Sequence, residues 1–255
     1  MISPIPYLQL PTLQLGPLTL SIFGALVATG ILVGSRLASR FGRARGVPQR
    51  SLERLVTWAV VVGLAFAHWV SVLGYYPDRV AADPWLLLRF HDGLSSVGGF
   101  LGGVLAFAWL TRRDSQRWLI ADTLMYGLVA GFTFGRLGCA LVHDHPGMLV
   151  DPWHPLAVGP WPDGRARIDL GLVEFVGMCG LCVFVYTRRW ETPGRLTLIV
   201  ASIYGVVRFA VDFQRADDLR HFGLTPAQWA TLTLVLVCLG AYRAKSRREK
   251  IPASL

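Results

Sequence analysis

Charged residues are scarce in this chain. Aspartate, glutamate, lysine and arginine make up 16% of its 255 residues, whereas hydrophobic residues make up 53%. Soluble domains carry about 25% charged residues, so this composition excludes an ordinary soluble fold and indicates a membrane protein. The sequence also lacks linkers, internal repeats and low-complexity tracts, and we therefore expect one integral membrane domain over residues 1–255.

Acidic residues are the rarer charged class. The chain has 16 aspartates and glutamates against 25 lysines and arginines, which gives a net charge of +9. A soluble domain this basic would suggest nucleic acid as a partner. Here the basic residues gather between apolar stretches instead, so we expect anionic lipid head groups, and no nucleic acid, to balance the charge. The clusters are Arg36–Arg54, Arg112–Arg117, Arg188–Arg195 and Arg243–Lys250.

Seven apolar stretches approach the length of about 20 residues that a membrane-spanning helix needs. They are Leu18–Ala38, Leu52–Leu73, Leu94–Leu110, Trp118–Leu141, Leu170–Tyr186, Leu196–Phe213 and Trp229–Tyr242. With seven spans, all the basic clusters fall on one side, which the positive-inside rule assigns to the cytoplasm. The sequence therefore predicts an all-α, polytopic membrane protein with seven transmembrane helices, an outer N-terminus and an inner C-terminus. The proline-rich outer segment 143–169 predicts an irregular cap, because proline fixes φ and lacks a backbone donor.

Cysteine is also rare, and Cys139, Cys179, Cys182 and Cys238 all fall within predicted spans. Cys179 and Cys182 have CxxC spacing, but on an apolar helix we favour buried cysteines that act as small hydrophobic residues. Residues 1–17 lack a basic n-region, so no cleavable signal peptide is expected.

Two arginines, Arg136 and Arg208, lie inside apolar stretches. A charge at membrane depth is costly, so it usually lines a wet cavity or meets a counter-charge. A guanidinium presents a planar donor fork that matches phosphate oxygens, which favours a site for a phospholipid phosphate. The alternative is a purely structural pair with an internal acid such as Glu174 or Asp212.

Tyr204, Arg208 and Asp212 are spaced four residues apart and would share one helical face. With Arg215 they predict a polar stripe that leads outward. An ion pair between Arg208 and Asp212 within the helix is the alternative. Glu174, near the outer end of the fifth span, is a candidate counter-charge for either arginine.

The segment His143, Asp144 and His145 allows three interpretations. An HxH spacing is a weak metal signal, and the sequence fixes no third ligand, so we predict no metal and no cofactor. A histidine beside a carboxylate suits proton transfer. Loop capping is the remaining alternative.

The segment GLSSVGGFLGG opens the third predicted span. Its glycines permit close helix packing. They would equally let a lipid approach bare backbone around Gly98 and Gly99, with Ser95 and Ser96 as donors.

Several segments, in chain order, resemble one family, the bacterial prolipoprotein diacylglyceryl transferases. GLSSVGGFLGG is similar to the family's glycine-rich stretch, and GRLGCALVHDHPG to its GRxGNFxNxE signature. YGVVRFAVDFQR is similar to its YGxxRFxxExxR segment, and FGLTPAQW to the start of its last helix. The resemblance implies a reaction in which the diacylglyceryl unit of phosphatidylglycerol moves to a cysteine thiol of a lipoprotein precursor.

Carried over position by position, the resemblance makes Arg136 and Arg208 the phosphate-binding arginines. It also places Tyr204 and Glu174 at family site positions. The implied partners are phosphatidylglycerol or another anionic phospholipid and a lipoprotein precursor peptide. The implied location is the bacterial inner membrane, with a periplasmic N-terminus and a cytoplasmic C-terminus.

The chain departs from the family pattern at several site positions. Asp212 and Asp144 replace glutamates, Phe23 replaces a tyrosine, and Cys139 replaces the signature asparagine. Val97 stands where the family has a histidine often assigned as the base, and valine cannot accept a proton.

Another histidine would have to replace that base. His143, His145 or His91 could do so if a loop folds over the site. Two alternatives to the transferase therefore stay open: a homologue with altered acceptor or lipid chemistry, and a non-catalytic lipid-binding membrane protein.

The expected catalytic residues are Arg136, Arg208, His143, Asp144 and Tyr204. The expected substrate-binding residues are Ser95, Ser96, Gly98, Gly99, Cys139, Glu174, Asp212 and Arg215.

Overall fold

The computed structural model describes residues 3–8, 13–15, 18–89, 94–216, 220 and 222–250. The chain forms two compact units. Met1–Ala38 and Met125–Leu255 make up what we call the larger unit, and Ser39–Leu124 make up the smaller unit. The prediction of one membrane domain over the whole chain stays a prediction.

Each of the seven apolar stretches overlaps one α-helix. They are α1 (Ile22–Arg43), α2 (Gln49–Tyr75), α4 (Ser96–Thr111), α5 (Arg117–Val142), α6 (Leu170–Tyr186), α7 (Arg195–Val211) and α8 (Pro226–Lys250). Four segments, Ile22–Arg43, Gln49–Gly74, Arg117–Val142 and Arg195–Gln214, are long and apolar enough to cross a membrane. Helices α4 and α6 are apolar but shorter. The helices thus support a helical membrane protein, and the number of seven spans stays a prediction.

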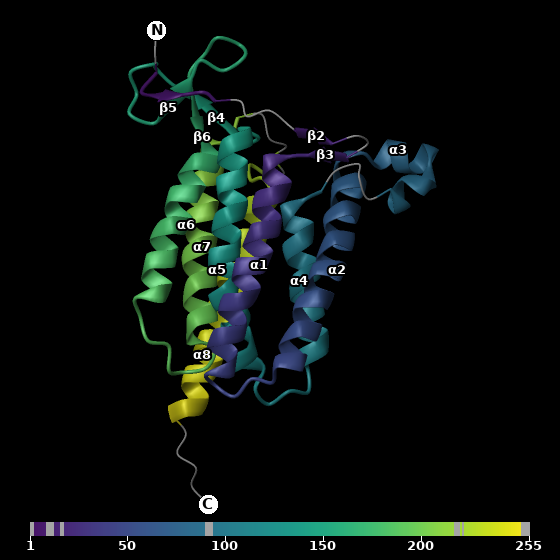
Figure 1. Ribbon diagram of the computed structural model, residues 1–255, viewed down its shortest axis with the longest axis vertical. Helices are drawn as coiled ribbons and strands as arrows, with labels where there is room; N and C mark the ends of the chain where they lie inside the picture. Colours follow the sequence, from purple (N-terminus) through teal and green to yellow (C-terminus); the bar gives the residue numbers. More distant parts are fainter. Residues whose placement is uncertain are drawn as a thin grey trace, which may run out of the picture. The chain divides into compact units, whose positions relative to one another are not determined.

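In the larger unit, helices α5, α6, α7 and α8 stand side by side, and the first part of α1 runs along α5 (Figure 1). Glycines allow this approach. A methyl group at Gly34 would lie 2.8 Å from the Gly127 carbonyl oxygen, and one at Gly131 would lie 2.8 Å from the Gly30 carbonyl oxygen. Small residues commonly line helix contacts in membranes, because they let two backbones meet. The close contact holds the stretch of α5 that precedes Arg136.

A small sheet joins the ends of α5 and α6 in the larger unit (Figure 1). Its strands run in the order β1 (Ile5–Pro6), β5 (Ala157–Gly159), β6 (Arg167–Asp169) and β4 (Pro146–Leu149). β1 is parallel to β5, and β6 is antiparallel to both β5 and β4. The prediction of an irregular cap was therefore wrong for these residues. The strands are too short for polar and apolar residues to alternate visibly in the sequence. Proline is tolerated at their ends, because the missing backbone N–H falls where strand pairing stops.

A second pairing in the larger unit is the two-stranded antiparallel sheet of β2 (Leu13–Leu15) and β3 (Leu18–Leu20), which precedes α1.

In the smaller unit, α2 packs against α4 through the glycine-rich segment. A methyl group at Gly98 would lie 2.9 Å from the Ala67 Cα, and one at Gly102 would lie 2.9 Å from the Gly63 Cα. Close helix packing is therefore the structural role of these two glycines. Two short elements follow α2, the helix α3 (Pro77–Ala82) and the 3₁₀ helix η1 (Pro84–Leu88).

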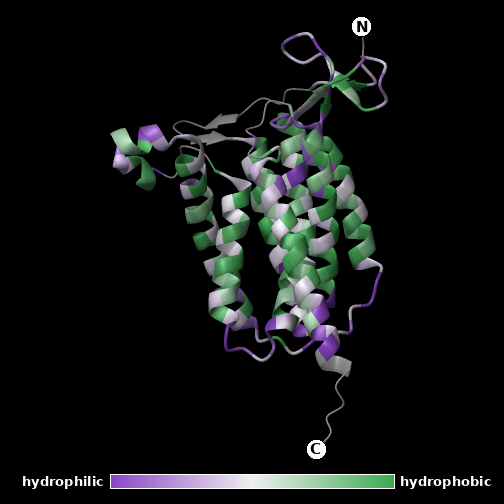
Figure 2. Cartoon of the chain, turned by 180° about the vertical axis from the view of Figure 1, so that it is seen from behind, coloured by the Kyte–Doolittle hydropathy of each residue, from purple (hydrophilic) through white to green (hydrophobic). Residues whose placement is uncertain are grey.

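Large apolar side chains point outward from the helices of the larger unit. Val176 and Val183 on α6, Val206 on α7, and Leu236 and Val237 on α8 are all exposed. In each unit the helices are mostly hydrophobic along their length, and hydrophilic residues gather toward their ends (Figure 2). An outer surface of this kind fits a lipid environment, because apolar side chains face hydrocarbon without cost.

Candidate functional site

Glu174 on α6 holds both intramembrane arginines. Its Oε2 lies 2.8 Å from Arg136 Nε on α5, and its Oε1 lies 3.2 Å from Arg208 Nη1 on α7. All three side chains are buried. The two guanidinium groups thus converge from separate helices, and Glu174, the candidate counter-charge for either arginine, pairs with both.

The remaining donors of Arg136 contact neighbouring side chains. Its Nη2 donates to the Tyr204 hydroxyl at 3.2 Å, and its Nη1 lies 3.9 Å from Cys139 Sγ. The guanidinium carbon also lies 4.7 Å from the centre of the Phe132 ring. These contacts on three sides fix the orientation of the Arg136 guanidinium.

Arg208 is held a second time by Asp212, whose Oδ1 lies 2.7 Å from Arg208 Nη1. Helix α7 ends at Val211, and Asp212 opens the 3₁₀ helix η2 (Asp212–Gln214). The Thr225 hydroxyl donates to Asp212 Oδ2. Arg208 and Asp212 thus form the ion pair that was the alternative to a polar stripe, and of the four stripe residues only Tyr204 and Arg208 lie on α7. The stripe itself stays a prediction.

Thr225 owes its position to a capping box at the start of α8. Its Oγ1 accepts a hydrogen bond from the Gln228 backbone N–H at 3.1 Å, and the Gln228 side chain accepts one from the Thr225 N–H at 2.9 Å. Pro226 takes the first helical position, where no backbone donor is needed. This reciprocal pair satisfies two donors at the helix start. The segment LTPAQW therefore both begins α8 and anchors Asp212.

The charges of this group are balanced: two arginines face Glu174 and Asp212. Both arginines are therefore ion-paired. An empty anion site would instead present cations without a counter-charge. Among the described residues, Arg208 Nε and Nη2 have no hydrogen-bond or ion-pair partner. Three N–H groups of Arg208 are thus available to an incoming oxygen.

His143 and Asp169 form a second polar pair. His143 follows the last residue of α5 and has a φ of 52°, a value that non-glycine residues rarely adopt. Its Nδ1 lies 2.5 Å from Oδ2 of the buried Asp169, whose Oδ1 also accepts a hydrogen bond from Leu172 N at the start of α6. Burial raises the pKa of the Asp169 carboxyl, and the hydrogen bond with His143 opposes that rise.

Aromatic rings fix the His143 imidazole in place. It stacks on Tyr7 at a centroid distance of 4.3 Å and meets Trp161 edge-on at 5.7 Å. Its Nε2 has no hydrogen-bond partner among the described residues. A carboxylate on Nδ1 and an open Nε2 is the arrangement of an oriented proton acceptor.

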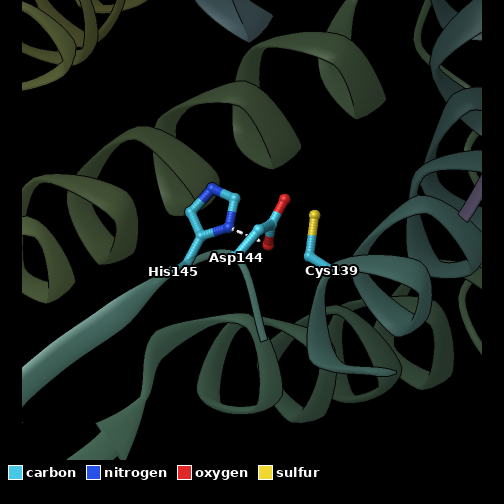
Figure 3. A group of neighbouring side chains, drawn as sticks. All are labelled: Cys139, Asp144 and His145. Carbon is cyan, nitrogen blue, oxygen red and sulfur yellow. Dashed lines mark hydrogen bonds and ion pairs between the residues drawn. The ribbon is translucent and has the colours of Figure 1, made fainter. Parts of the chain in front are cut away.

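Asp144 and His145 form the third polar pair, in which the Asp144 carboxylate contacts His145 Nδ1. Cys139 lies beside them, on the last turn of α5 (Figure 3). Asp144 also lines a cavity of about 550 Å³. The other lining residues are Pro146, Trp161, Pro162, Asp163, Arg167, Arg215 and Ala216. Neither Arg136 nor Arg208 is among them.

The remaining predicted site residues belong to the smaller unit. Ser95 caps α4, with its Oγ 3.4 Å from the Gly98 backbone nitrogen, and Ser96 is exposed. Gly99 lies on the same helix, and Val97 occupies its second position. The proposed substrate contacts of these residues stay predictions. His91 lies outside the described residues.

The whole chain was then compared with known proteins. A family model described as prolipoprotein diacylglyceryl transferase matches residues 11–243. The chain belongs to this family. A relative from Geobacillus kaustophilus is 29% identical over 245 residues, which cover 90% of each chain. One from Gloeobacter violaceus is 28% identical over 255 residues, 94% of each chain, and one from Bacillus cereus is 29% identical over 258 residues, 94% of this chain and 93% of the relative. All three are named phosphatidylglycerol–prolipoprotein diacylglyceryl transferase.

Family membership confirms the resemblance drawn from the sequence segments, while the roles of individual residues stay predictions. Sequence analysis missed Asp169, Thr225 and Gln228. The capping pattern Thr-x-x-Gln was a usable signal for the last two. No pattern in the sequence pairs His143 with Asp169, because 26 positions and a sheet separate them.

Proposed function

We propose that this protein is a phosphatidylglycerol–prolipoprotein diacylglyceryl transferase of the bacterial inner membrane. It moves the diacylglyceryl unit of phosphatidylglycerol onto a cysteine thiol of a lipoprotein precursor and releases glycerol phosphate. The observation that carries the proposal is the convergence of Arg136 and Arg208 on Glu174, inside a chain of this family.

The arginines hold the lipid phosphate. Glycerol phosphate gains negative charge as it leaves, so fixed donors aimed at its oxygens lower the barrier. The open Nε and Nη2 of Arg208 are the first contacts available, and Glu174 would have to release part of Arg136 or Arg208 as the phosphate enters. Tyr204 keeps Arg136 oriented during this exchange.

His143 supplies the base that Val97 cannot. The thiolate is the reactive form of the acceptor cysteine, so a proton acceptor accelerates the attack. Asp169 holds the proton of His143 on Nδ1, which leaves Nε2 ready to take the thiol proton. The proton would later leave with the released glycerol phosphate or with water.

The cavity beside Asp144 receives the polar part of a substrate. It carries two acidic and two basic residues in its lining, Asp144 and Asp163 with Arg167 and Arg215. Mixed charges of this kind suit a peptide backbone or a glycerol head group. The substrate-binding role of Cys139, Asp212 and the serines and glycines of α4 belongs to the same proposal.

The helices are arranged with seven spans, the N-terminus in the periplasm and the C-terminus in the cytoplasm. The basic clusters support this orientation, because Arg188 and Arg189 lie between α6 and α7, Arg195 begins α7, and Arg243–Lys250 form the end of α8. In that orientation the sheet, His143 and the cavity face the periplasm, where lipoprotein precursors arrive.

The test is transfer of label from phosphatidylglycerol to a peptide that carries the acceptor cysteine. Purified protein in detergent should produce labelled peptide, and Arg136→Ala and Arg208→Ala should abolish it. Arg188→Ala is the matched control, because this arginine at the other end of α6 is exposed and lies over the Phe184 ring. Lipid binding without any transfer by the intact protein would contradict the proposal and favour a lipid-binding role.

A further inference from the structure

We infer that Cys139, Asp144 and His145 form a binding site for a soft divalent cation of the zinc class. One ligand atom from each residue lies within 4.8 Å of the other two. Figure 3 shows the three side chains directed toward a common space at the end of α5. This goes beyond the transferase activity, and it departs from the sequence-based prediction that no metal is bound.

The fold brings Cys139 beside Asp144 and His145, whereas His143, the other histidine of the HxH pattern, pairs with Asp169. Cys139 lies on the last turn of α5, which ends at Val142. His143 then takes its left-handed conformation, and this reverses the chain direction. Asp144 and His145 consequently return over the helix end toward Cys139. His145 is fixed there, because its carbonyl oxygen accepts a hydrogen bond from Leu170 N at 3.1 Å.

The donor set matches zinc better than the hard cations. Thiolate, imidazole and carboxylate are the zinc ligands of proteins, whereas calcium and magnesium prefer oxygen alone. Ligand atoms around a tetrahedral zinc lie about 3.3–3.6 Å apart, as its bond lengths require. Around a cation, the Asp144 and His145 ligand atoms would move apart from their present hydrogen-bond contact, and Cys139 Sγ would approach them by about 1 Å. Three protein ligands leave a fourth position for water.

The contacts already present hold the ligand groups together in the absence of a cation. The bond between Asp144 and His145 Nδ1 holds a proton at the position that a cation would take. When Nδ1 binds the metal, this proton moves to Nε2 of the neutral imidazole, and the Cys139 thiol releases one proton to solvent. Arg136 Nη1, 3.9 Å from Sγ, stabilises the resulting thiolate. Asp144 is exposed and lines the cavity, which gives the cation a path from solvent.

The bound cation would also connect the cavity with the arginine group. Asp144 lines the cavity, and Cys139 contacts Arg136. A cation between these two side chains would fix Asp144 and withdraw its charge from the cavity. The proposed site does not depend on transfer chemistry, because it is measured without lipid or peptide.

Cobalt(II) binding provides the test, since cobalt occupies zinc sites and its bond to a thiolate absorbs in the near ultraviolet. The full-length protein, free of any histidine tag and treated with chelator, should bind one cobalt ion with a thiolate band, and zinc should displace it. Cys139→Ser should remove the band, and His145→Asn should weaken binding more than about 100-fold, because even the outer partners of metal ligands are worth 10–100-fold.

Cys238→Ser is the matched control, because this second buried cysteine lies on α8, outside the cluster. It should leave the band and the affinity unchanged. A thiolate band that survives Cys139→Ser, or the absence of any thiolate band in the intact protein, would overturn the inference. If Cys139→Ser does not fold, the loss of affinity in His145→Asn and Asp144→Asn decides it. Failure of lipid transfer would bear only on the proposed function.

Discussion

The hydroxyl of Thr225, which caps helix α8, donates a hydrogen bond to Asp212, the carboxylate that holds Arg208. The start of one helix therefore positions a charge that belongs to another. The family resemblance of the segment FGLTPAQW gains a physical reason from this contact: the segment serves the arginine as well as the helix.

Replacing Thr225 tests its two roles, the cap of helix α8 and the hydrogen bond to Asp212. Thr225→Val should cost about 0.5–2 kcal/mol of stability through the lost cap. It should also reduce the rate of lipid transfer, because Asp212 no longer holds Arg208 in one orientation. Thr225→Ser keeps both hydrogen bonds and should behave like the parent. Thermal unfolding and transfer rates of the two variants in detergent measure both effects; equal transfer rates would argue against the link to Arg208.

Glu174→Gln should destabilise the protein by about 3–5 kcal/mol, because it leaves buried guanidinium groups without their shared counter-charge. An anionic phospholipid should restore part of this loss by replacing the missing charge. The measurement is the melting temperature with and without phosphatidylglycerol. Diacylglycerol, which has the acyl chains but no phosphate, is the control lipid, and equal stabilisation by both lipids would count against phosphate binding at this site.

His143→Ala and Asp169→Asn should each lower the transfer rate by about 10²–10⁴-fold, the usual contribution of a general base. The double variant should be no slower than the His143 variant alone, because the two residues act as one unit. Additive losses would show that the pair only supports the sheet.

Gly131→Ala should destabilise the larger unit by about 1–3 kcal/mol, because the added methyl group meets the Gly30 carbonyl oxygen and forces α1 and α5 apart. Gly135→Ala lies one turn further along the same helix, in open space. It should be neutral or stabilising, since alanine favours helix by about 1 kcal/mol over glycine. The melting temperatures of the two variants separate the cost of disturbed helix packing at Gly131 from the gain in helix propensity at Gly135.

Asp163 provides a prediction about pH. The hydrogen bond from Arg167 holds the pKa of this carboxyl below its usual range. A lowered pKa stabilises the fold above the unfolded value of about 3.9, and the benefit disappears as the pH falls through the folded value. Any difference in melting temperature between the parent and Asp163→Asn should therefore be constant from pH 8 to pH 5 and vanish in stronger acid. A difference that changes between pH 8 and pH 6 would contradict this assignment.

The sequence predicts the helices well and the sheet poorly, for a physical reason. A span of some 20 apolar residues is a strong local signal, and each predicted stretch overlaps one α-helix. Strand β1 pairs Ile5 with Val158, so its partner is 153 positions away and neither strand shows a pattern. The division into two units also follows from packing between distant residues, which apolar stretches do not reveal.

Part of the candidate site could likewise be predicted from the sequence, and part could not. Arg136, Arg208 and Glu174 could be predicted because charge inside an apolar stretch must be compensated. The sequence could not predict that one carboxylate serves both arginines. The choice between Glu174 and Asp212 depends on how α6 and α7 face each other. The partner of His143 depends on the left-handed backbone conformation of this residue. A histidine rarely adopts that conformation, and the sequence gives no signal for it.

A carboxylate shared by two cations also makes three helices mechanically dependent on one another. Glu174 ties α6 to α5 through one oxygen and to α7 through the other. If the arginines hold the lipid phosphate as proposed, a head group that takes over either arginine would loosen a helix contact in the same event. Lipid entry between the helices would then need no separate hinge.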